Sequence, residues 1–162
     1  MDPEKFNQLV LLKKLYSVEG IGPQKIFSLL NRFKTLEQIF DASQYKLQEV
    51  EGINKHLSAK IIRSSESRDK VESELYKELF VLEKMNARLT SYFDEDYPEI
   101  LKNIYFPPLF LYIKGYFEQS DYNAIAIVGT REPSNYGKTV ADTLSRELAE
   151  KGITTVSGLA RG

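Results

Sequence analysis

The sequence contains no cysteine and no tryptophan, and its one histidine is His56. The absence of cysteine excludes a disulfide scaffold, a cysteine-ligated zinc finger and a cysteine nucleophile, and it is typical of a reducing compartment. A single histidine argues against a histidine-based metal site and against a catalytic triad. The composition therefore gives no support for a metal centre or for these kinds of catalysis.

Long apolar runs and an excess of positive charge are absent as well. The longest apolar run, Leu109 to Ile113, is too short to cross a bilayer, and the N-terminal MDPEKFNQ is too polar for a signal peptide. We therefore expect a cytoplasmic protein without a membrane segment. The 22 basic and 23 acidic residues give a net charge of −1, so any binding of an anion must depend on a few locally placed groups.

Glycine is scarce before residue 115, where only three of the nine glycines lie. Apolar residues recur there at helical spacing, which predicts a helical first part. The polar stretch Arg63 to Glu74 contains no Gly or Pro, so we expect an exposed connecting helix through it. The predicted helices cover residues 5–16, 23–33, 35–41 and 43–49, followed by a long helix from Leu57 to Leu82.

The remainder of the chain reads as strands and helices joined by glycine turns. Strands are predicted over 87–92, 109–114, 124–128 and 153–156, and a helix over 136–151. The strand–helix–strand order of the last three elements is that of a βαβ unit with a parallel sheet. We therefore expect three parts: a helical domain over 1–66, a connecting helix over 67–88 and an α/β part over 89–162.

Two segments, Val18 to Ile26 and Val50 to Ser58, share the string V-E-G-I and lie 32 residues apart. The first fits the helix-hairpin-helix pattern, in which glycines permit a tight hairpin and backbone N–H groups at the following helix meet a phosphate. A second phosphate site is thus predicted at Gly20, Gly22, Lys25, Gly52 and Lys55. The same repeat also serves as a packing scaffold or partner module, which we favour because residues 1–92 hold 15 basic against 13 acidic residues.

The loop after the predicted strand 124–128 does not match either of two familiar phosphate-binding motifs. A Walker A loop ending in Gly137-Lys138-Thr139 needs glycine where Glu132 stands, and a dinucleotide fingerprint needs glycine where Arg131 stands. Neither motif is therefore present.

The two parallel strands place their following loops side by side at one sheet edge. These loops carry small hydroxyl residues, glycines and two arginines next to a helix N-terminus, which together predict an anion pocket. No activated nucleophile accompanies them, so binding is better supported than catalysis. The predicted pocket residues are Gly129, Thr130, Arg131, Ser134, Tyr136, Gly137, Lys138, Ser157, Gly158, Arg161 and Gly162.

The strings IVGTREPSNYG and VSGLARG, preceded by YPEILKNIYFPPLFLYIKG, resemble the DNA-processing protein A (DprA/Smf) family. The resemblance implies an α+α/β fold: an N-terminal helix-hairpin-helix (SAM-like) domain, then the start of an extended Rossmann-type parallel sheet. It also implies a protein that binds single-stranded DNA, protects incoming strands in natural transformation and helps to load the RecA recombinase, without catalysis or a cofactor. Arg131 and Arg161 would contact phosphate.

The family pattern continues beyond the last glycine of this chain, so we expect a fragment. The resemblance implies that the elements for the homodimer interface and for RecA contact are missing. Two alternatives stay open. One is a nucleotide phosphoribohydrolase of the lysine-decarboxylase-like group, which has a similar Rossmann core. The other is a helical protein-interaction module formed by residues 1–66.

Overall fold

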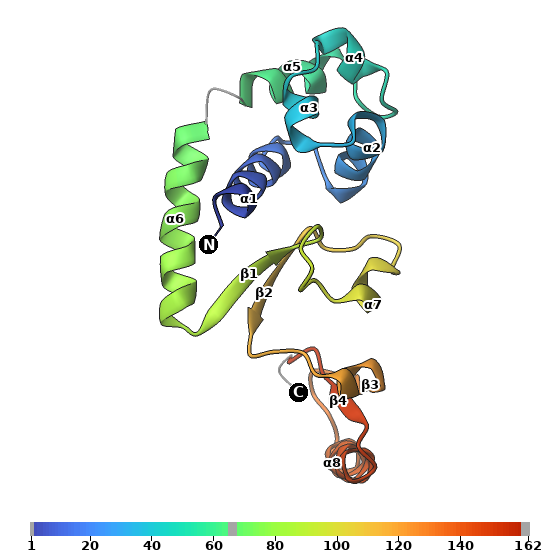
Figure 1. The fold of residues 1–162 in the computed structure, drawn as a ribbon. Coiled ribbons are helices and arrows are strands. Elements are labelled where there is room, and N and C mark those ends of the chain that lie inside the picture. Colours follow the sequence, from blue (N-terminus) through green and yellow to red (C-terminus); the bar gives the residue numbers. More distant parts are fainter. Residues whose placement is uncertain (1, 65–67, 160–162) are drawn as a thin grey trace. The chain divides into compact units, whose positions relative to one another are not determined.

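The computed structural model describes residues 2–64 and 68–159 and divides the chain into two compact units, residues 1–115 and 116–162 (Figure 1). The first unit contains α1 (Pro3–Tyr16), α2 (Pro23–Phe33), α3 (Leu36–Phe40), α4 (Gln44–Gln48), α5 (Lys55–Arg63), α6 (Arg68–Lys84), β1 (Ala87–Ser91), α7 (Glu99–Lys102) and β2 (Phe110–Lys114). The second contains the 3-10 helix η2 (Gln119–Tyr122), β3 (Ala124–Ala126), α8 (Asn135–Glu150) and β4 (Thr154–Val156).

Local capping fixes where the first helices begin. The side chains of Asp2, Thr35, Ser43 and Asn54 accept hydrogen bonds from backbone N–H groups in the first turns of α1, α3, α4 and α5. Such caps satisfy donors that the helix itself leaves unpaired, and Pro23 at the start of α2 has no N–H to satisfy. The four helices predicted between residues 5 and 49 are confirmed.

The main hydrophobic core is formed by side chains from the five helices α1, α2, α3, α4 and α5. Its side chains come from both sequence repeats and are almost completely removed from solvent, which stabilises the unit by roughly 1.5–3 kcal/mol for each large aliphatic side chain. The most deeply buried members are Leu12, Leu15, Ile26, Leu29, Ile39, Leu47 and Ile61.

A second cluster attaches α6 and the β1–β2 hairpin to α1. Leu9 and Val10 of α1 meet Leu75 of α6 and Leu89 of β1, and all four are buried. The hairpin is antiparallel, with Ala87 opposite Lys114. Because α1 contributes to both clusters, one compact unit extends to residue 115, whereas the sequence places domain limits at 66 and 88.

Where the sequence predicts one long helix from Leu57 to Leu82, the structure describes two helices, and residues 65–67 of the prediction lie outside the described residues. The N–H of Ser64 closes the end of α5, and α6 begins at Arg68. The helix α6 is also not simply an exposed connector, because Leu75 is fully buried against α1.

The two V-E-G-I hairpins pack against each other through their glycines. Gly20 and Gly52 have φ angles of +92° and +81°, a region that side chains with a Cβ rarely adopt. A Cβ on Gly20 would lie 3.0 Å from Leu57 of the second repeat, and one on Gly52 would lie 3.3 Å from the Lys25 side chain of the first. Gly20 and Gly52 therefore each leave room for a side chain of the other repeat.

The same substitution at two neighbouring glycines should have opposite effects on stability. Gly20→Ser should lower the free energy of unfolding by about 1–3 kcal/mol, because serine must adopt positive φ and displace Leu57. Gly22→Ser should leave it unchanged or raise it by up to about 1 kcal/mol, because Gly22 caps α2 in an extended conformation with open space around it, and a hydroxyl would cap the helix. Urea unfolding followed by circular dichroism measures both; equal losses would contradict the packing described.

The second unit is a small βαβ unit. Strands β3 and β4 pair in parallel, with Ile125 opposite Thr155, and α8 connects them, as the sequence predicts. Among the described residues of this unit none is fully buried, so it lacks a core comparable to that of the first unit. The described sheets, β1–β2 and β3–β4, have two strands each, so the extended parallel sheet expected from the sequence is not part of the described structure. Within the described ranges, no helix has the length and apolar character needed to cross a membrane.

Candidate nucleic-acid interface

The loops that follow β3 and β4 open at the same edge of the parallel pair. The N–H of Ile127 still donates to the carbonyl of Val156 at 2.9 Å, so the chain leaves the sheet only after these residues. The first loop then enters α8 at Ser134, whose hydroxyl accepts from the N–H of Gly137 at 3.1 Å. The geometry brings two strand ends and one helix N-terminus together.

A hollow of about 610 Å³ lies between these elements. It is lined by most of the residues that the sequence assigns to the pocket: Gly129, Thr130, Arg131, Ser134, Gly137, Lys138, Ser157 and Gly158. Arg131 and Lys138 give the hollow two positive charges, and the partial positive charge of the α8 N-terminus adds to them. Asp142 brings one carboxylate to the lining, which is paired with Arg146. The site therefore has the donors and the charge that an oxyanion requires.

The other three predicted residues are Tyr136, Arg161 and Gly162. Tyr136 is 80% exposed and does not line the hollow, while Arg161 and Gly162 lie outside the described residues. Sequence reasoning also missed two polar residues of α8, Asp142 and Ser145, which line the hollow. Their spacing from Lys138 at helical intervals is the signal that could have found them.

Gly129 and Gly158 were expected to form tight turns, but neither has a positive φ angle. A Cβ at either position would meet no atom within 4 Å. Gly129 and Gly158 therefore leave open space beside the hollow, so that a ligand can approach the backbone closely.

The residues of the predicted second phosphate site lie at the two hairpins of the first unit. Gly22 stands at the N-terminus of α2, and Lys55 is the first residue of α5. The ammonium of Lys25 donates to the carbonyl of Gly20 at 2.7 Å and thereby closes its own hairpin. Lys25 thus has a structural contact that explains its position without a phosphate.

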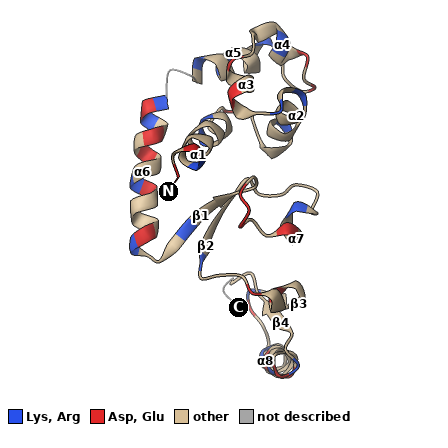
Figure 2. Ribbon diagram, viewed as in Figure 1, with Lys and Arg blue, Asp and Glu red and all other residues tan. Residues whose placement is uncertain are grey.

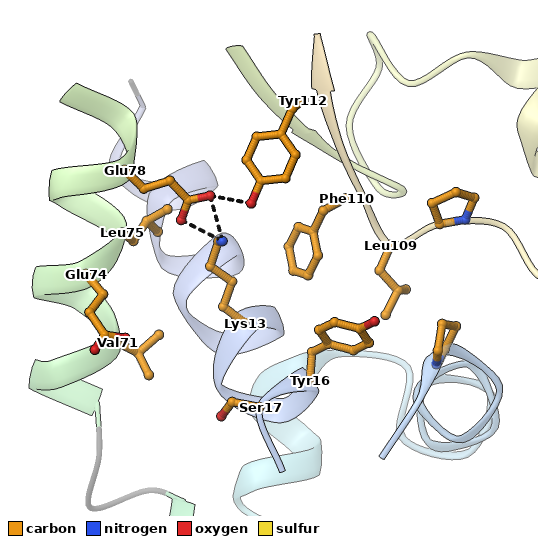
Figure 3. Close-up of a pocket in the computed structure, with 12 residues that line it drawn as sticks. Lys13, Tyr16, Ser17, Val71, Glu74, Leu75, Glu78, Leu109, Phe110 and Tyr112 are labelled. Atoms are coloured by element: carbon orange, nitrogen blue, oxygen red, sulfur yellow. Dashed lines mark hydrogen bonds and ion pairs between the residues drawn. The ribbon is translucent and has the colours of Figure 1, made fainter. Parts of the chain in front are cut away.

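A different hollow of about 450 Å³ lies in the first unit, between α1, α6 and β2 (Figure 3). The ammonium of Lys13 contacts both carboxylate oxygens of Glu78, at 2.7 and 3.0 Å, and the Tyr112 hydroxyl donates to the same carboxylate. Partial burial and this hydrogen bond raise the pKa of Tyr112 to about 12. Lys13 and Glu78 are thus paired with each other, and together with Tyr112 they connect α1, α6 and β2.

Charge elsewhere is mixed. Figure 2 shows Lys and Arg alternating with Asp and Glu along α6, and ion pairs such as Arg32–Glu49 at 2.9 Å neutralise surface cations. A broad basic face is not seen among the described residues. Any polyanion would therefore contact local sites such as the loop hollow of the second unit.

Two family models match different parts of the chain. Residues 88–162 match the family described as DNA recombination-mediator protein A, and residues 12–66 match the SAM-like helix-hairpin-helix tandem. Protein Smf of Synechocystis sp. is 32% identical over 149 residues, which cover 90% of this chain. The chain is a member of the DprA/Smf family.

Other relatives match shorter stretches. DNA processing protein DprA of Bacillus subtilis is 48% identical over 69 residues, covering 42% of this chain and 23% of that protein. UvrABC system protein C of Desulfotalea psychrophila is 43% identical over 67 residues, covering 41% of this chain and 11% of that protein. This DprA/Smf member spans 36% of the length of the Synechocystis relative and less of the other two. No solved structure matches it.

Proposed function

We propose that this DprA/Smf member binds the backbone of single-stranded DNA in the hollow between the β3 and β4 loops. One observation carries the proposal: two strand-end loops and the capped N-terminus of α8 converge on a single hollow with Arg131 and Lys138 in its wall. Open α/β sheets bind ligands at such edges, and phosphate is the anion that best uses backbone N–H groups together with an arginine.

The relatives support a role in DNA processing, since a mediator of DNA recombination and a DNA-processing protein are named among the matches. We extend this to protection of single strands, assistance to the RecA recombinase and a cytoplasmic location. In the whole protein, the second unit would be the start of an extended Rossmann-type sheet, and the protein would form a homodimer. Binding, not catalysis, would be its task, because among the described residues the hollow has no nucleophile paired with a base.

The test is binding of a fluorescently labelled oligothymidylate to the 162-residue protein, followed by anisotropy at several salt concentrations. We expect dissociation constants of roughly 1–100 µM at low salt. The logarithm of affinity should fall against the logarithm of salt with a slope of about −1.4, as two phosphate contacts require. Absence of binding at low salt would contradict the proposal. Release of free base from nucleoside monophosphates would contradict its non-catalytic part.

A further inference from the structure

A second surface of the first unit combines exposed aromatic rings with polar side chains. It surrounds a shallow hollow of about 450 Å³ between α2 and the segment that follows α7. The rings of Tyr105 and Phe106 are 88% and 52% exposed and stand edge to face, with their centroids 4.4 Å apart. The hollow is lined by Gln24, Phe27, Ser28, Asn31, Tyr105 and Phe106.

The scaffold under this surface is well packed. The ring of Phe27 lies edge-on to Tyr92, which in turn contacts Tyr97. Tyr97 is 2% exposed, and its hydroxyl donates to the carbonyl of Pro108 at 2.9 Å. Buried Pro107 directly follows the exposed pair. Two large rings are thus presented to solvent on a fixed support.

Two side-chain amides of the hollow are available to bind a ligand. Among the described residues, no hydrogen bond engages the side-chain amides of Gln24 and Asn31, and both residues are exposed. The Lys34 ammonium donates to the backbone carbonyl of Asn31 at 2.8 Å, so a cation stands beside the hollow. Of the other cations between Glu19 and Glu37, Arg32 is paired with Glu49 and Lys25 donates to the carbonyl of Gly20. Lys34 is therefore the cation that favours a polyanion at this hollow.

We infer that this hollow takes bases of a single-stranded nucleic acid, with one base stacked on Tyr105 or Phe106. Stacking suits any base, because every base has a π face, and the amides of Gln24 and Asn31 supply both donors and acceptors for base edges. The inference rests on the proposed function, since both concern single-stranded nucleic acid, but it adds a base contact within the first unit.

The experiment compares two oligonucleotides of about 20 nucleotides with the same phosphates, one oligothymidylate and one abasic throughout. The variant Tyr105→Ala/Phe106→Ala should bind oligothymidylate about 5-fold or more weakly than the unmodified protein, in line with alanine substitution of stacking rings. Its affinity for the abasic strand should not change. Tyr45→Ala is the matched control, because Tyr45 is 76% exposed in the same unit and does not line the hollow, and it should change neither affinity.

The outcomes separate the two proposals. If the double variant binds oligothymidylate normally while Arg131→Ala weakens it, the stacking surface is wrong and the proposed function stands. An equal loss for the abasic strand would also overturn stacking, since it would show that the bases are not contacted. If the unmodified protein binds neither strand, the proposed function fails, and this inference fails with it.

Discussion

Arg131→Ala is expected to lower the affinity for oligothymidylate at least 10-fold at low salt. A hydrogen bond to a charged group contributes about 1.5–3 kcal/mol, and Arg131 is the arginine among the described residues that line the hollow. The substitution also removes one of the two expected phosphate contacts, so the salt slope should fall to about −0.7. Anisotropy titrations across a salt series measure both quantities.

Lys151→Ala is the matched control for this prediction. Lys151 lies in the same unit, directly follows α8 and is exposed. It carries the same charge but does not line the hollow. Removing it should change affinity by less than about 2-fold if long-range charge contributes little at moderate salt. Equal losses for the two variants would show that general charge, not the loop hollow, binds the strand.

Leu29→Ala is expected to destabilise the first unit by about 2–5 kcal/mol. Leu29 is fully buried at the centre of the cluster that joins α1 to α5, so truncation leaves a cavity as well as removing apolar contacts. Because the free energy of unfolding of a domain is about 5–15 kcal/mol, this is a large fraction of the total. Urea unfolding followed by circular dichroism at 222 nm measures the shift of the main transition.

The same substitution in the second unit should have little effect on that transition. Leu144 of α8 is 43% exposed, so Leu144→Ala should change it by less than about 0.5 kcal/mol. The contrast tests whether the core resides in residues 1–115. A comparable loss for both variants would mean that the two units unfold as one, which their separate packing does not predict.

Local features of the sequence predicted much of the fold. Helical periodicity located the first helices, because this signal depends only on neighbours along the chain. The strand–helix–strand spacing likewise predicted the βαβ unit. Because the two strands are parallel, their topology alone predicted that the loops of Gly129 and Ser157 would meet in one hollow.

What the sequence did not predict depends on residues far apart. The assignment of β1 and β2 to the first unit requires the contact of Leu89 with Leu9 and Leu75, which no local pattern encodes. The Lys13–Glu78 pair joins positions 65 residues apart, so it too has no signature in sequence spacing. Gly129 and Gly158 do not have the positive φ angles of a tight glycine turn, because glycine can adopt such angles but does not require them.

The most direct test of the central claim is a nuclear magnetic resonance titration of the isotope-labelled protein with oligothymidylate. The claim is that the strand's phosphates lie between the β3 and β4 loops at the N-terminus of α8. The account predicts the largest amide shifts at Gly129, Thr130, Gly137 and Ser157, with smaller changes in the hairpins around Gly22 and Lys55. Shifts concentrated at those hairpins, with the two loops unaffected, would contradict it.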